Sequence, residues 1–380
     1  MNPARSVETG SAMSGVHEKY RNELSFRATQ AGRKLVRGLI GGLVDWAPRS
    51  PTAPGYTVLI GCNSALLGVL ACNLRFLANQ DLRNAHEVLV VVDRPRSTLK
   101  NDVEPALRER FPTLPLEFLY YTPRQRRTCD LVAWPWVQAW LSWSIGIAHT
   151  NTRHALLHDQ DAMLLRSSIC EERFRTVVDQ GVDYLGVKYY RGNGLVPEDL
   201  LATTFELMFD AVEVRRNHAP IDLFNHVTRF RGRRVDFDTF LHAQSLRGSV
   251  STLPIAEEDM VHPSQLICQF EDHRTGRRAV PSTNGLPLVP YFRYVGEEPG
   301  MLRSMTVQLE QRSGASVDFE GGPLDLSRLP PAHIRWLAKQ AFRLEVALSG
   351  EVRPEVRRYF AALDAFVARA TGSPPTLPPT

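Results

Sequence analysis

The segment from His154 to Leu165 (HALLHDQDAMLL) contains two aspartates, Asp159 and Asp161, separated by one glutamine. Apolar residues precede the pair and follow it, which is typical of a buried strand whose end is marked by polar side chains. Two carboxylates at this spacing can bind a hard divalent cation and leave coordination positions open for phosphate oxygens. In the simpler alternative, one aspartate caps a helix and the other faces water.

Other polar residues stand after the ends of three further apolar segments. They are Asn63, Asp93 and the arginines Arg124, Arg126 and Arg127. The carboxyl ends of parallel strands meet at one edge of a sheet, and ligands bind there in open α/β folds. Arginine suits the oxygens of a diphosphate because its planar guanidinium donates two parallel hydrogen bonds. A solvated basic loop is the alternative for each arginine.

Short apolar segments alternate with helical patterns between Tyr56 and His158. The expected strands are 56–61, 87–92, 116–121 and 155–158, and the expected helices between them are 67–77, 103–110 and 134–149. This alternation predicts an α/β fold with a mostly parallel sheet flanked by helices. Three tryptophans at helical spacing, Trp136, Trp140 and Trp143, are expected to pack in the core rather than to form a platform for a sugar.

Between Tyr56 and Phe270 the chain resembles the GT-A class of nucleotide-sugar glycosyltransferases, in particular its D-x-D-containing, family-2-like members. The stretches that carry the resemblance are IGCNS (60–64), Asn73-Leu74, VVVD (90–93), the DQD segment, DFDTFLHA (236–243) and VHPSQL (261–266). The resemblance implies a GT-A (Rossmann-like) fold. It also implies an enzyme that transfers a sugar from a UDP- or GDP-linked donor to a hydroxyl acceptor, with Mn²⁺ or Mg²⁺ as the cofactor.

The resemblance assigns roles to residues that match the motifs. Asn63 and Asp93 would hold the nucleoside of the donor. Asp159 and Asp161 would hold the metal ion, and Asp159 would also contact the ribose and phosphate. The diphosphate needs positive charge beyond the metal ion, for which Arg126 and its arginine neighbours are the candidates.

Further candidates lie downstream of the DQD segment. His262 is the expected third metal ligand, since imidazole is an acceptable ligand for Mn²⁺, and His273 is the alternative. If the reaction inverts the anomeric configuration, a carboxylate must accept the proton of the attacking hydroxyl. Asp238 is the expected base, with Glu258 and Asp259 as the alternatives.

Two other functions remain open for a chain with this pattern. A sugar-nucleotide nucleotidyltransferase would share the fold, but that class usually carries a glycine-rich loop ending in arginine and lysine after the first strand, and GCNSALLG does not provide one. A non-catalytic sugar-binding protein would also share the fold, although an intact DQD argues against a degenerate site. The sequence contains neither a dinucleotide-binding G-x-G-x-x-G nor a P-loop at a position where phosphate binding would need one.

The two ends of the chain have helical patterns of their own. Leu35 to Val44 recur at helical spacing next to basic residues, which predicts a helix that either packs on the main domain or lies on an anionic membrane through residues 33–46, with Trp46 as an anchor. The C-terminal stripes predict a helical hairpin. The expected organisation is 1–54 as a polar segment, helix and linker, 55–295 as the catalytic domain, 296–371 as a helical extension, and 372–380 as a disordered tail.

Composition excludes several classes of protein. The chain has 380 residues, 43% of them hydrophobic, and a net charge of +4, which is ordinary for a globular protein and too small to indicate nucleic-acid binding. No apolar run approaches the ~20 residues that span a bilayer. The five cysteines include no C-x-x-C pair, so neither a disulfide framework nor a zinc site is expected. A cytoplasmic location, with peripheral membrane contact as an open alternative, is the expectation.

Overall fold

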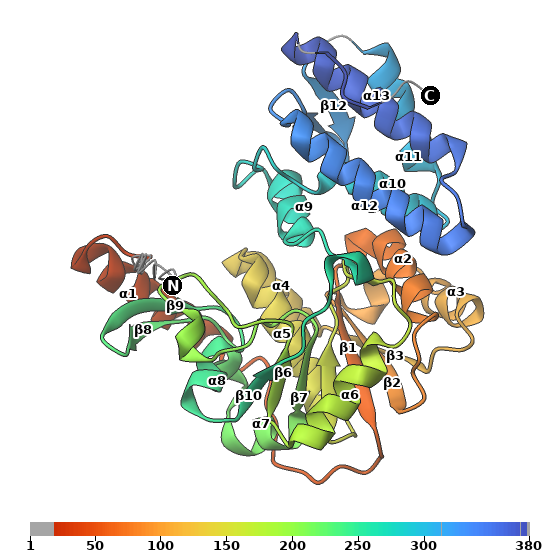
Figure 1. Cartoon of the computed structure of the whole chain (residues 1–380). Coiled ribbons are helices and arrows are strands. Elements are labelled where there is room, and N and C mark those ends of the chain that lie inside the picture. Colours follow the sequence, from red (N-terminus) through yellow and green to blue (C-terminus); the bar gives the residue numbers. More distant parts are fainter. Residues whose placement is uncertain (1–18, 313, 373, 378–380) are drawn as a thin grey trace, which may run out of the picture.

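The computed structural model describes residues 19–312, 314–372 and 374–377. Its centre is a seven-stranded sheet in the order β10-β6-β7-β4-β1-β2-β3 (Figure 1). The strands of this sheet are β1 (Tyr56–Cys62), β2 (Ala85–Val92), β3 (Leu116–Tyr120), β4 (His154–Leu157), β6 (Tyr184–Gly186), β7 (Leu207–Asp210) and β10 (Val250–Thr252). Three separate strand pairs are β5 (Met163–Leu164) with β11 (Met260–Val261), β8 (His226–Phe230) with β9 (Arg233–Phe237), and β12 (Ser316–Phe319) with β13 (Gly322–Asp325).

Helices cover both faces of the central sheet, because successive side chains of a strand point to opposite faces. In β1, Val58 and Ile60 share a core with α2, whereas Leu59 shares another core with α5. The helices between the strands are α2 (Leu67–Leu77), α3 (Val103–Arg110), α4 (Pro123–Val132), α5 (Pro135–His149), α6 (Ile169–Gln180), α7 (Ala211–Asn217) and α8 (Leu241–Leu246). The expected α/β architecture is therefore confirmed.

The sheet is mostly parallel, with one reversed strand. The strands β3, β2, β1 and β4 are mutually parallel, as the sequence predicts. Strand β7 runs antiparallel to both of its neighbours, β4 and β6, and β10 is parallel to β6. The sequence did not indicate β6, β7 or β10. They are three or four residues long, which is too short for a periodic pattern to identify.

The N-terminal helix α1 (Glu23–Ile40) packs beside the β8–β9 pair (Figure 1). It begins earlier than predicted and ends before Gly41, so Leu43 and Val44 follow the helix instead of continuing it. The guanidinium of Arg33 lies 3.6 Å from the ring centre of Trp134, and the indole N–H of Trp46 donates to the carbonyl of His218. These two side chains thus contact the protein itself. The N-terminal polar segment before residue 19 lies outside the described residues.

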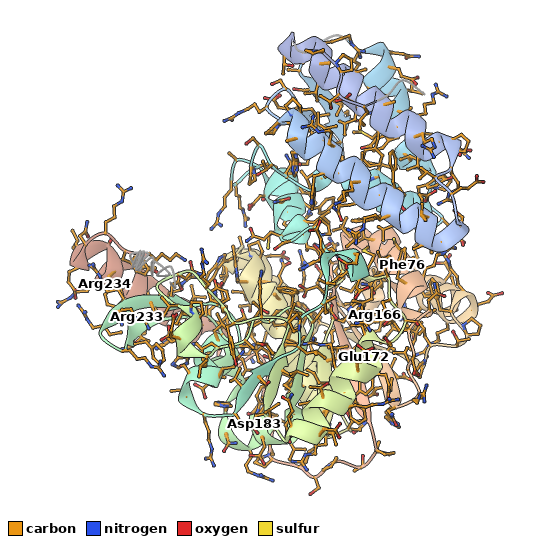
Figure 2. All side chains as sticks on the ribbon, in the orientation of Figure 1. Phe76, Arg166, Glu172, Asp183, Arg233 and Arg234 are labelled. Atoms are coloured by element: carbon orange, nitrogen blue, oxygen red, sulfur yellow. The ribbon has the colours of Figure 1, made fainter. Side chains whose placement is uncertain are left out.

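The C-terminal helices form a second unit above the sheet (Figure 1). They are α9 (Leu266–Thr275), α10 (Val289–Val295), α11 (Gly300–Gln311), α12 (Pro331–Ser349) and α13 (Pro354–Thr371). The predicted hairpin corresponds to α12 and α13, whereas α11 and the β12–β13 pair were not expected. One hydrophobic core joins this unit to α2, whose Phe76 is labelled in Figure 2. The expected boundary between 295 and 296 lies between α10 and α11, which both belong to this core.

The described part of the C-terminal tail is attached to α13. The backbone N–H of Leu377 and the hydroxyl of Thr376 donate to the carboxylate of Asp364, at 2.7 and 2.8 Å. The buried carboxylate of Asp364 thus binds Thr376 and Leu377 of the expected tail. None of the described helices combines the length and the apolar character needed to cross a bilayer.

The close approach of α2 to the end of α10 depends on a glycine. A methyl group added at Gly296 would lie 2.1 Å from the carbonyl oxygen of Gly68, whereas one added at Gly300 would meet nothing within 4 Å. We expect Gly296→Ala to lower the free energy of unfolding by ~2 kcal/mol or more, because overpacking a rigid contact typically costs ~1–3 kcal/mol. The matched variant Gly300→Ala should change it by less than ~1 kcal/mol. Urea unfolding measures both, and equal midpoints for the two variants would contradict this view of the contact.

Candidate active site

A cavity of about 820 Å³ opens at the carboxyl ends of the parallel strands. Its walls come from segments far apart in the chain: the ends of β1, β2, β4 and β6, the first half of α5, the stretch before β7, and the region of α9. Its lining residues include Asn63, Asp93, Trp136, Trp143, Asp159, Gln160, Asp161, Lys188, Tyr189, Tyr190, Arg191, Phe205, Asp238, His262 and Glu271. The predicted edge of the sheet is thus the location of this cavity.

The DQD turn is fixed by its middle residue. Gln160 is 1% exposed; its side chain accepts from the backbone N–H of Asn63 and donates to the carbonyl of Leu66, both at 2.8 Å. These bonds tie the turn after β4 to the turn after β1. Asp159 and Asp161, on either side of the buried glutamine, line the cavity.

A buried polar network supports the same turn, with residues from α2 and from the position just before β7. The amide of Asn73 donates to the carbonyls of Asp159 and Ala162, at 3.0 and 2.6 Å. It also contacts His158, whose Nδ1 lies 2.7 Å from the Glu206 carboxylate. Glu206 has φ +50°, a left-handed conformation that costs energy for a residue other than glycine. Such strain is typical of segments held in place for function.

His262 joins the aspartates because two short strands pair. Strand β11 runs antiparallel to β5, with Val261 opposite Met163, so the next residue, His262, lies beside the DQD turn. Its Nε2 is 3.3 Å from a carboxylate oxygen of Asp159 and 3.6 Å from one of Asp161. Burial lowers the pKa of His262, but the two carboxylates outweigh it and raise that pKa to about 10.

These three residues form a candidate metal site. Their ligand atoms all lie within 4.8 Å of one another, and they are the one such group among the described residues. Two carboxylates and one imidazole suit Mn²⁺ or Mg²⁺, which prefer oxygen ligands and tolerate nitrogen to different degrees. His273, the alternative third ligand, contacts the carbonyl of Phe319 through its Nε2 instead.

The side of the cavity near β1 and β2 is held together by Asp93 and Asn63. Asp93 accepts from the backbone N–H of Ser64 at 2.9 Å and pairs with Arg126 at 3.1 Å. The Asn63 side chain accepts from the N–H of Ala65 and donates to Glu271, at 2.9 and 2.8 Å. Asn63 therefore uses both ends of its amide to shape the turn and to attach it to α9.

The predicted arginines lie on helix α4 and not in a loop. Arg126 reaches Asp93 but does not line the cavity, and it also pairs with Asp130. Arg124 and Arg127 are exposed and do not line the cavity. The helix begins there because Pro123 follows Thr122, whose side chain forms a capping box with Gln125.

Asp238 lies on the other side of the metal group, at the end of β9. Its carboxylate accepts from Tyr190, Asn193 and Asn225 at 2.7, 3.2 and 3.1 Å. Burial raises the pKa of Asp238, and the neighbouring Asp236 adds to the rise although the Tyr190 hydrogen bond opposes it. Asp238 is thus a carboxylate in the cavity with a raised pKa, which suits a general base.

The two alternative bases lie outside the cavity. Glu258 is exposed, and Asp259 pairs with Arg166 at 2.8 Å. Neither lines the cavity. Arg166 also bonds to Glu172, and Figure 2 shows these two side chains next to each other at the start of α6.

Several lining residues were not predicted as functional. Trp140 is fully buried, as expected for a core residue, but Trp136 and Trp143 line the cavity. All three tryptophans thus contact the core as expected, but Trp136 and Trp143 are only partly buried and also line the cavity. Trp136 and Trp143 are seven residues apart, which places them on one face of α5. This spacing was the only feature of the sequence that could have pointed to a shared role for them. No motif or periodic pattern in the sequence marked Lys188 or Arg191 as a functional residue.

Comparisons with known proteins reveal distant structural neighbours. No family model matches the chain, and no curated protein matches it in sequence. TarS from S. aureus matches with a TM-score of 0.38 and 11% identity, covering 83% of this chain and 49% of TarS; the chain thus spans about half the length of that protein. The galactosyltransferase LgtC, solved with donor and acceptor sugar analogs, matches with a TM-score of 0.37 and 10% identity, covering 52% of this chain and 72% of LgtC.

A third neighbour is the mannosyltransferase PcManGT from Pyrobaculum calidifontis, solved with GDP-Man and Mn²⁺. It matches with a TM-score of 0.32 and 13% identity, covering 86% of this chain and 96% of its own. Identities and TM-scores this low assign neither an activity nor a substrate. The function of this chain has to be inferred from its own site.

The metal group yields a direct prediction. Replacing Asp161 by asparagine removes one negative ligand, so we expect Asp161→Asn to weaken Mn²⁺ binding by ~10-fold or more with the fold unchanged. Calorimetric titration with Mn²⁺, with and without a nucleoside diphosphate, measures the change, and circular dichroism checks the fold. Asp179→Asn, at an exposed position of α6, is the matched control and should bind Mn²⁺ like the parent protein. Unchanged affinity in Asp161→Asn would exclude Asp161 as a ligand.

Proposed function

We propose that the chain is a metal-dependent glycosyltransferase that transfers a sugar from a nucleotide-sugar donor to a hydroxyl acceptor. The observation that carries the proposal is the group of Asp159, Asp161 and His262, whose ligand atoms lie within 4.8 Å of one another, in the wall of a cavity of about 820 Å³. Ligand sites for small molecules range from ~300 to ~1,000 Å³, so this cavity has room for a nucleotide sugar.

Mn²⁺ or Mg²⁺ would be held by Asp159, Asp161 and His262. When bound, the ion supplies positive charge that stabilises the departing nucleoside diphosphate. The residues of the chain hold the metal ligands in position. Gln160 and Asn73 keep the two carboxylates at the cavity wall, and β11 keeps His262 opposite them.

The nucleoside of the donor is proposed to lie between the metal group and Asp93. A carboxylate has about four lone-pair positions, so Asp93 can accept from a ribose hydroxyl or a base N–H in addition to Ser64 and Arg126. Arg126 and Asn63 act as positioning residues, because their contacts are with Asp93 and with Glu271 and Ala65. Arg127 is exposed outside the cavity, so a contact with the donor would require it to move. Uridine and guanosine donors both fit this description.

The acceptor hydroxyl is proposed to bind next to Asp238. In an inverting reaction the hydroxyl oxygen attacks the anomeric carbon, the bond from that carbon to the phosphate oxygen breaks, and the hydroxyl proton passes to Asp238. Hydrogen bonds from Tyr190, Asn193 and Asn225 keep this carboxylate oriented. Asp238 is preferred over Glu258 and Asp259 because it alone of the three lines the cavity.

Product analysis tests the proposed function and separates it from the alternatives. The purified protein is incubated with Mn²⁺ and a panel of UDP- and GDP-linked sugars, and release of the nucleoside diphosphate is measured. Release that depends on Mn²⁺ is the expected result. Pyrophosphate release from a nucleoside triphosphate and a sugar 1-phosphate would identify a nucleotidyltransferase instead. Nucleotide-sugar binding without any turnover would identify a non-catalytic binding protein.

A cytoplasmic location with peripheral membrane contact is also proposed. All five cysteines are free thiols, four of them buried, which agrees with a reducing compartment. Within residues 33–46, Leu35 and Leu39 are 72% and 60% exposed on the outer side of α1, and the exposed Lys34 lies beside them. An exposed apolar stripe next to positive charge is typical of helices that lie on anionic membranes.

Sedimentation with vesicles tests the membrane contact. We expect the full chain to bind vesicles of mixed neutral and anionic phospholipid, and the Leu35→Glu/Leu39→Glu variant to lose most of this binding, because each glutamate removes apolar area and repels the lipid. Leu131→Glu, at a position 78% exposed on α4, is the control. Equal binding by the two variants would exclude α1 as the membrane contact.

The role of Asp238 is tested by kinetics. Asp238→Asn should lower kcat by ~10²–10⁴-fold with little change in donor affinity, which is the usual effect of losing a general base. Because the pKa of Asp238 is raised and the base must be ionised, kcat should fall as pH drops through a range above that of an ordinary aspartate. Asp259→Asn and Glu258→Gln are matched controls. Full activity of Asp238→Asn with an inverted product, read by NMR, would exclude Asp238 as the base.

A further inference from the structure

The strand order places the two proposed substrates on opposite sides of the metal group. Asp93 follows β2, the DQD turn follows β4, and Lys188 follows β6. In the order β6-β7-β4-β1-β2, β2 and β6 each stand two strands from β4, on opposite sides. Neighbouring strands are about 4.8 Å apart, so Lys188 is displaced from the metal group by about 10 Å in the direction away from Asp93. This half of the cavity contains Asp238 and is the acceptor half in the proposed function.

The acceptor half of the cavity carries two positive charges that the described protein does not neutralise. Lys188 and Arg191 line the cavity and are exposed, and neither has an ion-pair partner among the described residues. The Asp238 carboxylate is engaged by Tyr190, Asn193 and Asn225. In contrast, Arg126 on the donor side is already paired with Asp93 and Asp130. The free positive charge of the cavity wall is therefore concentrated on the acceptor side.

The segment that carries these two cations is held in place by backbone hydrogen bonds. The N–H of Thr203 donates to the carbonyl of Lys188 at 2.9 Å, the N–H of Tyr190 donates to the carbonyl of Leu201, and the N–H of Gly192 donates to the carbonyl of Leu195. The hydroxyl of Tyr190 in turn donates to Asp238. The backbone that carries the two cations is thus fixed relative to Asp238 by the fold, as a binding site requires.

Aromatic side chains accompany the cations. Tyr189 and Trp136 line the cavity with them, and both are partly exposed. Flat aromatic rings bind the apolar face of a sugar ring, while their polar atoms and the neighbouring cations contact its substituents. This combination fits a small polar molecule that has both a ring and a negative charge.

We propose that the acceptor is a hydroxyl compound that carries an anionic group, a phosphate or a carboxylate, and that Lys188 and Arg191 bind this group while the attacking hydroxyl lies at Asp238. The inference rests on the proposed function. In the reaction, the new bond joins the acceptor oxygen to the anomeric carbon, the nucleoside diphosphate leaves with the electron pair of the broken bond, and the proton passes to Asp238. The anionic group of the acceptor is not changed. Arg191 can bind either anion with two parallel hydrogen bonds, and Lys188 adds a point charge.

Calorimetry on the full chain tests the inference. The protein is first saturated with Mn²⁺ and UDP or GDP, and it is then titrated with matched sets of a neutral methyl glycoside, the corresponding sugar 6-phosphate and the corresponding uronate, in the gluco, galacto and manno series. We expect at least one anionic member to bind ~10-fold or more tightly than its neutral counterpart, and this preference to decrease at high salt. Tighter binding of the phosphates or of the uronates identifies which anion the site takes.

Variants complete the test. Lys188→Gln and Arg191→Gln should each weaken binding of the anionic probe by ~10-fold, the usual effect of losing a charge-assisted hydrogen bond, with nucleoside diphosphate affinity within ~2-fold of the parent. Lys100→Gln and Arg335→Gln, at exposed positions elsewhere, should leave both affinities unchanged. Equal binding of neutral and anionic probes, no binding of any anionic probe, or a large loss of nucleoside diphosphate affinity in Lys188→Gln would overturn the inference. A parent protein that binds no nucleoside diphosphate with Mn²⁺ would overturn the proposed function itself.

Discussion

Asp159 and Asp161 are two carboxylates held within 4.8 Å of each other and of His262, and like charges at such distances repel unless a cation lies between them. Among the described residues, the positive partner at this pair is His262, whose pKa the two carboxylates raise. The rest of the site serves to hold this unfavourable pair in position. Gln160 is buried and hydrogen-bonded to the turn after β1. Asn73 donates hydrogen bonds to the DQD turn at Asp159 and at Ala162. A structure that stabilises a concentrated negative charge in this way is suited to bind a divalent ion.

The location of the pair in the sheet determines what surrounds it. Strand β4 is central, so strands that end on either side of it can provide different groups: Asp93 on one side, and Lys188 with Tyr190 on the other. The C-terminal unit completes the enclosure through α9, whose Glu271 bonds to Asn63. Helix α2, which carries Asn73, packs in the hydrophobic core of that unit. The DQD turn and the α9 wall of the cavity are therefore connected through this core.

Strong local patterns made part of this arrangement predictable. Buried strands flanked by helices indicated the parallel half of the sheet, and the acids after β4 indicated the candidate metal site. The choice of His262 over His273 was not decidable, because it depends on β5 and β11, which are two residues long each. Helical spacing shows that Trp136 and Trp143 share a face, but it does not show whether that face meets a core or a cavity. Lys188 and Arg191 belong to an irregular segment without any periodic pattern.

The central claim is that Asp159, Asp161 and His262 together bind the metal ion of a nucleotide-sugar enzyme. Anomalous X-ray diffraction at the manganese edge, from crystals grown with Mn²⁺ and a nucleoside diphosphate, tests it most directly. The account predicts one strong anomalous peak within bonding distance of all three side chains and of phosphate oxygens of the nucleotide. Nucleotide density in the cavity without a manganese peak at these residues would contradict it.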